Sequence, residues 1–133
     1  CSLVIANMDV AFLIFVDQNH GFLMNHGLLI SGSLETMVLK LLYDEDRLYG
    51  YQIKKIILNK TDGDICVTEG SLYPVLKKLR MKGCLSYEYA LVNNRMRKYY
   101  QLTAEGKEVA VAKVREVQDF LRHLGRIMDP KCN

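Results

Sequence analysis

The sequence predicts a mainly α-helical fold that carries one small β-hairpin and ends in a long helix. Three successive stretches space their apolar residues three and four apart, as the buried faces of helices do, and two stretches of alternating pattern follow them. The length of 133 residues suits one domain with a modest core. Three short helices, a hairpin and a long helix, in this order, are typical of a winged helix-turn-helix domain.

The first two helices are predicted from their apolar stripes and their caps. Ser31 or Ser33 is expected to be the N-cap of the first helix, because serine accepts hydrogen bonds from free backbone N–H groups. The second helix is expected from Tyr49 to Lys60, and residues 65–67 after it are expected to form a short extended bridge. The stripe of the first helix consists of Leu34, Met37, Val38, Leu41 and Leu42.

The third helix is expected to begin after the N-cap Thr68 and to end near Lys82, where Gly83 can close it. Pro74 lies inside this helix, which is tolerable only close to the first turn. The predicted inner stripe consists of Leu72, Val75, Leu76 and Leu79.

The hairpin follows directly. Residues 85–91 alternate apolar with polar or small side chains, and residues 97–102 return as the second strand. Asn93 and Asn94 between them can adopt the left-handed conformations of a tight turn.

Thr103 is expected to cap a final helix of about 25 residues, which is long for a globular helix. Five of its apolar residues are spaced alternately three and four apart, as in the seam of a coiled coil. The sequence therefore predicts a homodimer, and the alternative that this helix folds back on its own domain stays open. The predicted dimerisation residues are Val114, Val117, Leu121, Leu124 and Met128.

The first 29 residues differ from the rest, since their only charged side chains are Asp9 and Asp17. Their densest apolar run, residues 10–16, is too short to cross a bilayer, and no basic segment precedes it, so neither a membrane span nor a secretory signal is expected. Two interpretations stay open: upstream sequence before a start at Met24, or an apolar extension that packs on the domain. The predicted division is 1–29 as an extension of uncertain status, 30–102 as the winged helix-turn-helix domain and 103–133 as the dimerisation helix.

Neither the cysteines nor the histidines have the spacing of a metal site. The four cysteines are expected to be free thiols in a reducing cytoplasm, with Cys66 and Cys84 buried. A redox sensor is the less favoured alternative. The sequence also lacks a Gly-rich phosphate loop and a nucleophile elbow, so that we expect no enzyme, no cofactor and no metal.

Basic residues gather in one part of the chain. Between Glu69 and Lys98 seven basic residues face two acidic ones, a net charge of +5, whereas the whole chain has +3. Such a cluster binds the DNA polyanion by releasing its counterions, although a solvated surface face stays an alternative. On the third helix the side opposite the apolar stripe is expected to meet DNA, with Tyr73 as a core residue being the alternative. This side carries Ser71, Tyr73, Pro74, Lys77 and Lys78.

Several segments together resemble the PadR family of transcriptional regulators. Residues 48–53 (LYGYQI) are similar to the family's YGYEI segment, and residues 69–79 (EGSLYPVLKKL) are similar to its recognition helix. Residues 97–103 (RKYYQLT), with Gly83 before them and Gly106 after them, resemble its wing. The resemblance spans about residues 31–106; Gln52 replaces the usual Glu, and the first 29 residues match nothing in the family pattern.

The resemblance implies a homodimeric repressor with a winged-helix head, a C-terminal dimerisation helix and a small-molecule effector near the dimer interface. By motif position it places Tyr49, Ser71, Tyr73, Pro74 and Lys77 in the DNA contact, and Arg95, Arg97 and Lys98 in the wing. We therefore expect a sequence-specific regulator that binds double-stranded DNA as a homodimer. A winged-helix adaptor that binds proteins instead of DNA is the alternative, which the basic residues disfavour.

Overall fold

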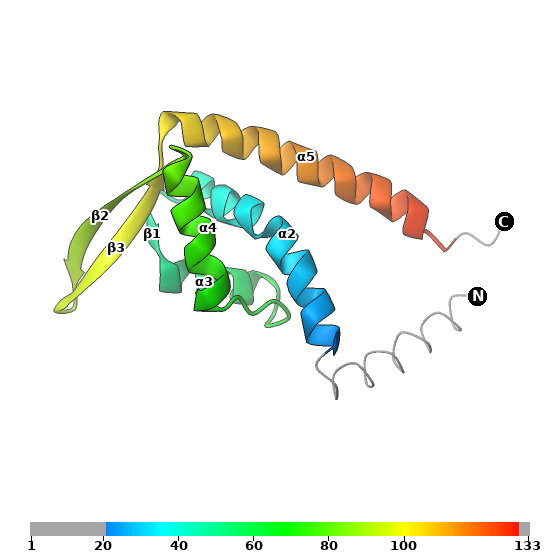
Figure 1. Ribbon diagram of the computed structural model, residues 1–133, viewed down its shortest axis with the longest axis horizontal. Coiled ribbons are helices and arrows are strands. Elements are labelled where there is room, and N and C mark those ends of the chain that lie inside the picture. The colour runs from blue at the N-terminus through cyan, green and yellow to red at the C-terminus, as the bar shows by residue number, and fades with distance from the viewer. Residues whose placement is uncertain (1–20, 131–133) are drawn as a thin grey trace.

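The computed structural model describes residues 21–130, and for residues 21–28 and residue 31 it describes the backbone alone. It confirms the predicted fold class: these residues form four helices and a small antiparallel sheet, whose hairpin projects from one side of the helices, and the last helix extends beyond the domain (Figure 1). The elements are α2 (Gly21–Asp44), β1 (Leu48–Tyr49), α3 (Gly50–Lys60), α4 (Glu69–Met81), β2 (Leu85–Val92), β3 (Arg95–Leu102) and α5 (Ala104–Met128).

The predicted start of the first helix is wrong, because α2 is already helical from Gly21 and passes through residues 31 and 33. The hydroxyl of Ser33 does not cap a helix start: it donates to the carbonyl oxygens of Leu29 (2.9 Å) and Ile30 (3.3 Å). The hydroxyl of a serine inside a helix can donate in this way to a carbonyl oxygen of the preceding turn. Residues 21–30 therefore belong to the helix instead of preceding it.

The core lies where α2 packs against α4, β3 and the first half of α5, and where α4 packs against α3 and β2. It is built from aliphatic side chains at helical spacing, as the stripes predicted. Val75 is only partly buried, at the margin of this core. The large side chains with least exposure are Leu34, Val38, Leu39, Ile53, Leu72, Leu76 and Leu79.

The sheet has three strands in the order β1-β3-β2, and the sequence predicted only the hairpin. Strand β1 pairs Leu48 with Tyr100 and Tyr49 with Tyr99. The extended bridge expected at residues 65–67 is not a strand, and Cys66, expected to be buried, is exposed. Val67 on its own takes the core position there, whereas Cys84 is buried as predicted.

The helix-turn-helix is formed by α3 and α4, and its caps follow the sequence. The side-chain oxygen of Gln52 accepts a hydrogen bond from the backbone N–H of Tyr49 (3.1 Å). Glutamine at this position therefore caps the start of α3 as the glutamate of the family pattern would. Thr68 accepts from the N–H of Ser71 (3.2 Å) at the start of α4. Pro74 is the sixth residue of α4, so it lies deeper than the first turn that we expected.

The hairpin and the last helix have the expected boundaries to within two residues. Asn93 (φ 52°) and Asn94 (φ 63°) form the left-handed turn between β2 and β3. The hydroxyl of Thr103 accepts from the N–H of Gly106 (3.0 Å) and so caps α5. The fully buried residues of α5 are Gly106 and Ala110, both near its start, so that its C-terminal half leaves the domain. Within residues 21–130, none of the helices is both long and apolar enough to cross a membrane.

Candidate nucleic-acid interface

Helix α4 divides its side chains as the sequence predicted. Leu72, Leu76 and Leu79 face the core without measurable exposure. The opposite side is exposed and carries the predicted contact residues Ser71, Pro74, Lys77 and Lys78. This arrangement leaves one side of an amphipathic helix, with its charges, open to a partner.

Tyr73 is neither a core residue nor a free surface residue. Its side chain is 47% exposed, and its ring lies against the start of α3. A Cβ on Gly50 would be 3.0 Å from the Tyr73 hydroxyl, which is closer than nearly all such contacts in proteins. The absence of a side chain at Gly50 therefore lets the hydroxyl end of the tyrosine pack against the start of α3.

The two lysines in the middle of α4 have different surroundings. The ammonium nitrogen of Lys78 lies 3.3 Å from a carboxylate oxygen of Glu35 on α2, and that of Lys82 lies 3.5 Å from the other oxygen. Lys77 forms no salt bridge with any residue between 21 and 130. Within the described chain, Lys77 is thus the more available of the two predicted contact lysines.

The three basic residues of the wing do not all lie at its tip. Arg95 directly follows the Asn93-Asn94 turn and is exposed. Arg97 and Lys98 are partly buried, and because successive residues of a strand point to opposite faces, they lie on opposite faces of the sheet. The ammonium group of Lys98 lies 4.0 Å from the centroid of the Tyr87 ring.

Stacked arginine and tyrosine side chains connect β1 to the wing. The guanidinium carbon of Arg97 lies 4.9 Å from the centroid of Tyr49, and that of Arg47 lies 4.4 Å from the centroid of Tyr99. The two tyrosines contact each other edge to face, with centroids 5.3 Å apart. Such cation–π and aromatic contacts fix the direction of otherwise flexible side chains.

Arg47 is a residue of this stack that the sequence did not reveal. It also forms a salt bridge of 2.7 Å with Glu88 on β2, 41 residues away in the chain. No local pattern marks Arg47, which follows an acidic loop. It joins the stack only because β1 adds to the hairpin.

A groove lies between the start of α3, helix α4 and strand β3. It brings together four of the predicted contact residues, namely Tyr49, Tyr73, Arg97 and Lys98. Ser71, Pro74, Lys77, Lys78 and Arg95 do not line it. Gly50, Tyr51, Glu69, Met96 and Tyr100 complete the lining. The tyrosine hydroxyls and the Arg97 guanidinium in this groove suit a phosphate backbone, whose oxygens accept hydrogen bonds. The ammonium group of Lys98 instead lies against Tyr87, which does not line the groove.

The predicted dimerisation residues divide into two groups on α5. Val114, Val117 and Leu124 are partly buried, whereas Leu121 and Met128 are 58% and 68% exposed. Phe120 and Ile127, which the seam did not include, are also exposed. The C-terminal half of α5 therefore presents an apolar surface that the described part of the chain does not cover.

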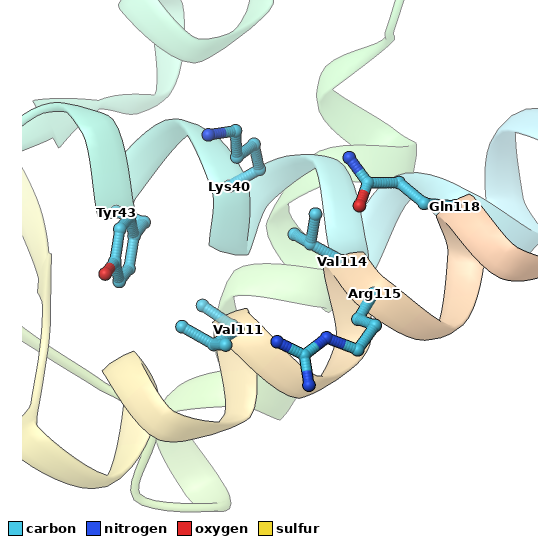
Figure 2. A pocket seen from close by; sticks show the side chains of 7 residues that line it. Lys40, Tyr43, Val111, Val114, Arg115 and Gln118 are labelled. Atoms are coloured by element: carbon cyan, nitrogen blue, oxygen red, sulfur yellow. The ribbon is translucent and has the colours of Figure 1, made fainter.

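A cavity lies between α2 and the first half of α5 (Figure 2). Lys40 and Tyr43 line it from α2, and valines of α5 form its apolar wall. Arg115 and Gln118 add a cation and an amide at its edge. Val114 belongs both to this cavity and to the predicted seam, so the two features are adjacent. The remaining lining residues are Ala110 and Val111.

The described residues hold no cluster of three or more histidine, cysteine or acidic side chains that could bind a metal ion.

Comparisons with known proteins identify the chain as similar to transcriptional regulators. The transcriptional regulator PadR-like family matches residues 38–112, more than half of the chain. A protein of Lysinibacillus sphaericus, named uncharacterized protein X, is 35% identical over 89 residues, which are 66% of this chain and 81% of that protein.

Solved structures agree with this match. A transcriptional regulator from Clostridium thermocellum is 30% identical, with a TM-score of 0.68 over 76% of this chain and 98% of its own. PadR of Bacillus subtilis, solved in complex with operator DNA, is 26% identical, with a TM-score of 0.54 over 61% of this chain and 46% of its own. The members of the family are transcriptional regulators, which agrees with the expectation that this chain is not an enzyme. This chain belongs to the PadR-like family of transcriptional regulators.

Proposed function

We propose that the protein is a cytoplasmic, sequence-specific DNA-binding repressor that acts as a homodimer. The observation that carries the proposal is the exposed, basic side of α4 beside a groove that Arg97 of the wing lines together with Tyr49 and Tyr73. Bacillus subtilis PadR, a structural relative, was solved with operator DNA. Residues 30–102 would form the DNA-binding part and residues 103–133 the dimerisation part.

In this proposal the two DNA-facing elements have different tasks. Helix α4 enters the major groove, where Ser71, Tyr73, Pro74, Lys77 and Lys78 meet bases and nearby phosphates. The wing, with Arg95, Arg97 and Lys98, and the neighbouring Tyr49 bind the backbone. Contacts to base edges discriminate between sequences, whereas phosphate contacts position the protein and add affinity for any DNA.

Dimerisation through α5 is supported by its exposed apolar residues. Leu121 and Met128 face solvent in the single chain, together with Phe120 and Ile127. Apolar side chains gathered on one helix face gain free energy when a partner covers them. A second copy of the chain is the simplest partner, because two symmetric heads can then reach adjacent half-sites of an operator.

A small-molecule effector that releases the repressor from DNA would fit the cavity between α2 and α5. The cavity joins an apolar wall to the cationic side chains of Lys40 and Arg115 (Figure 2). Lys40 already binds Asp44 at 2.9 Å, whereas Arg115 forms no salt bridge with any described residue. Because Val114 lines the cavity next to the proposed seam, a ligand there would alter the distance between the two heads.

The experiment that tests the proposal is selection of bound sequences from random duplex DNA, followed by titration of the enriched duplex and a shuffled one across a salt series. We expect tighter binding to the enriched duplex and a negative slope of the logarithm of affinity against that of salt. A protein that enriches no sequence and binds no duplex at low salt would be an adaptor instead. Binding without enrichment would refute sequence specificity alone.

A further inference from the structure

Glu35 of α2 and two lysines of α4 form an ion triad. One carboxylate oxygen lies 3.3 Å from the ammonium nitrogen of Lys78, and the other lies 3.5 Å from that of Lys82. The lysines are four residues apart, so both extend from the same side of the helix. A single carboxylate therefore pairs with two ammonium groups, one of which belongs to a predicted DNA-contact residue.

The carboxylate is less exposed than its two partners. The Glu35 side chain is 21% exposed, against 58% for Lys78 and 52% for Lys82. Partial burial raises the pKa of Glu35, but its hydrogen bonds and ion pairs with Lys78 and Lys82 outweigh this effect, so that the pKa lies below its ordinary value. Glu35 is thus ionised at neutral pH and needs a cation nearby, since an unpaired, partly buried charge is unfavourable.

The two lysines differ in their distance from the start of α4. Lys78 lies in the helix, whereas Lys82 is its C-cap. The N-terminal half of a recognition helix is the part that enters the major groove. Lys78, the tenth of the 13 residues of α4, lies one turn nearer to that half than Lys82. It is therefore the better placed of the two to reach a phosphate beside the groove, and Lys82 can stay on Glu35 when it does.

We propose that Glu35 competes with DNA phosphate for Lys78, and that Lys82 remains on the carboxylate when Lys78 transfers to DNA. This inference rests on the proposed DNA binding. Glu35 lowers the affinity for every duplex, because it withholds a sequence-independent phosphate contact until DNA displaces it. Lys82 makes the transfer feasible, because Glu35 does not lose its last cation.

The test is a double-mutant cycle on the full chain, with binding to enriched and shuffled duplexes measured at several salt concentrations. Glu35→Gln should tighten binding to both duplexes by about 1.5-fold to fivefold, the range expected when an exposed ion pair is removed. In a Lys78→Gln background the same change should have little effect. Lys77→Gln is the matched control: it removes the same charge from the neighbouring residue, and Glu35→Gln should keep its full effect there.

Other outcomes overturn the inference. If Glu35→Gln has an equal effect in the Lys77→Gln and Lys78→Gln backgrounds, the tighter binding comes from the change in net charge and not from competition for Lys78. If Glu35→Gln binds DNA more weakly than the unaltered protein, Glu35 has a purely structural role. If Glu35→Gln unfolds, Glu35→Asp retains the charge on a shorter side chain, and its failure to tighten binding would reject the competition. Absence of DNA binding by the unaltered protein would instead reject the proposed function.

Discussion

The carbonyl oxygen of Cys84 occupies the place where a side chain on Gly106 would begin. A Cβ on Gly106 would be 2.0 Å from this oxygen. Thr103, the N-cap of α5, donates to the same carbonyl (3.2 Å) and, more closely, to that of Gly83 (2.6 Å). The start of α5 is therefore fixed by backbone contact against the turn between α4 and β2, which only glycine at position 106 allows.

Gly106→Ala should destabilise the fold by about 2–4 kcal/mol, because backbone on both sides must move to admit the methyl group. Thermal or urea unfolding measures the effect. Gly32→Ala is the control, since Gly32 is an exposed helical glycine with nothing within 4 Å of the added Cβ. It should stabilise the protein by up to about 1 kcal/mol. Equal stabilities of the two variants would contradict the close contact at Gly106.

Leu121→Asp should convert the proposed dimer into a monomer. Leu121 is exposed in the single chain, and the dimer would bury the new carboxylate without a partner. Sedimentation velocity at micromolar concentration measures the change. Arg126→Asp is the control, because Arg126 is exposed and lies neither three nor four residues from any of the exposed apolar residues of this surface, so it should leave the dimer intact. An unaltered protein that sediments as a monomer would refute the dimer itself.

Replacing Arg95 and Arg97 by alanine should weaken binding to operator and random DNA alike, because the wing is proposed to bind phosphates. The slope of the logarithm of affinity against that of salt should become less steep by about one to two units. Arg126→Ala, near the far end of α5, serves as the control for charge loss. A loss of operator preference at an unchanged slope would assign base contacts to the wing.

Replacing Tyr73 or Lys77 by alanine should affect the operator more than random DNA. If either side chain touches a base edge, the loss of discrimination should be about 1–3 kcal/mol. The same titrations measure it, with operator and shuffled duplex compared at one salt concentration. Equal losses of affinity on both duplexes would show that these side chains contact only the DNA phosphate backbone.

Glu35 should make stability depend on pH in the acidic range. Its pKa is lowered in the folded protein, so the ionised triad stabilises the fold above the unfolded-state pKa, and this stabilisation is lost as the pH falls through the folded-state value. The unaltered protein should exceed Glu35→Gln in unfolding free energy at neutral pH, and the difference should shrink as the pH falls below 4.5, the ordinary pKa of a glutamate. Urea unfolding at several pH values checks this, and a constant difference would show that the charge is not involved.

Local patterns in the sequence determined most of the elements. The stripe of Leu72, Leu76 and Leu79 and the cap at Thr68 defined α4, because helix periodicity and capping depend on residues that are close in the chain. Asn93 and Asn94 defined the turn of the hairpin for the same reason. The motifs in these elements also indicated the PadR family. Local signals failed at the start of α2, because the two serines that were expected to cap this helix, at positions 31 and 33, lie inside it.

Only the tertiary structure decided which side chains of the candidate site meet. Arg47 contacts Glu88 from 41 residues away, and Lys82 contacts Glu35 from 47 residues away. Strand β1 has two residues, too few for an alternating pattern, and exists because β3 offers it a free edge. Such pairings depend on where the packed core brings separate elements together. The sequence therefore gives the residue types of the interface, while packing decides which of them are stacked, paired or available to DNA.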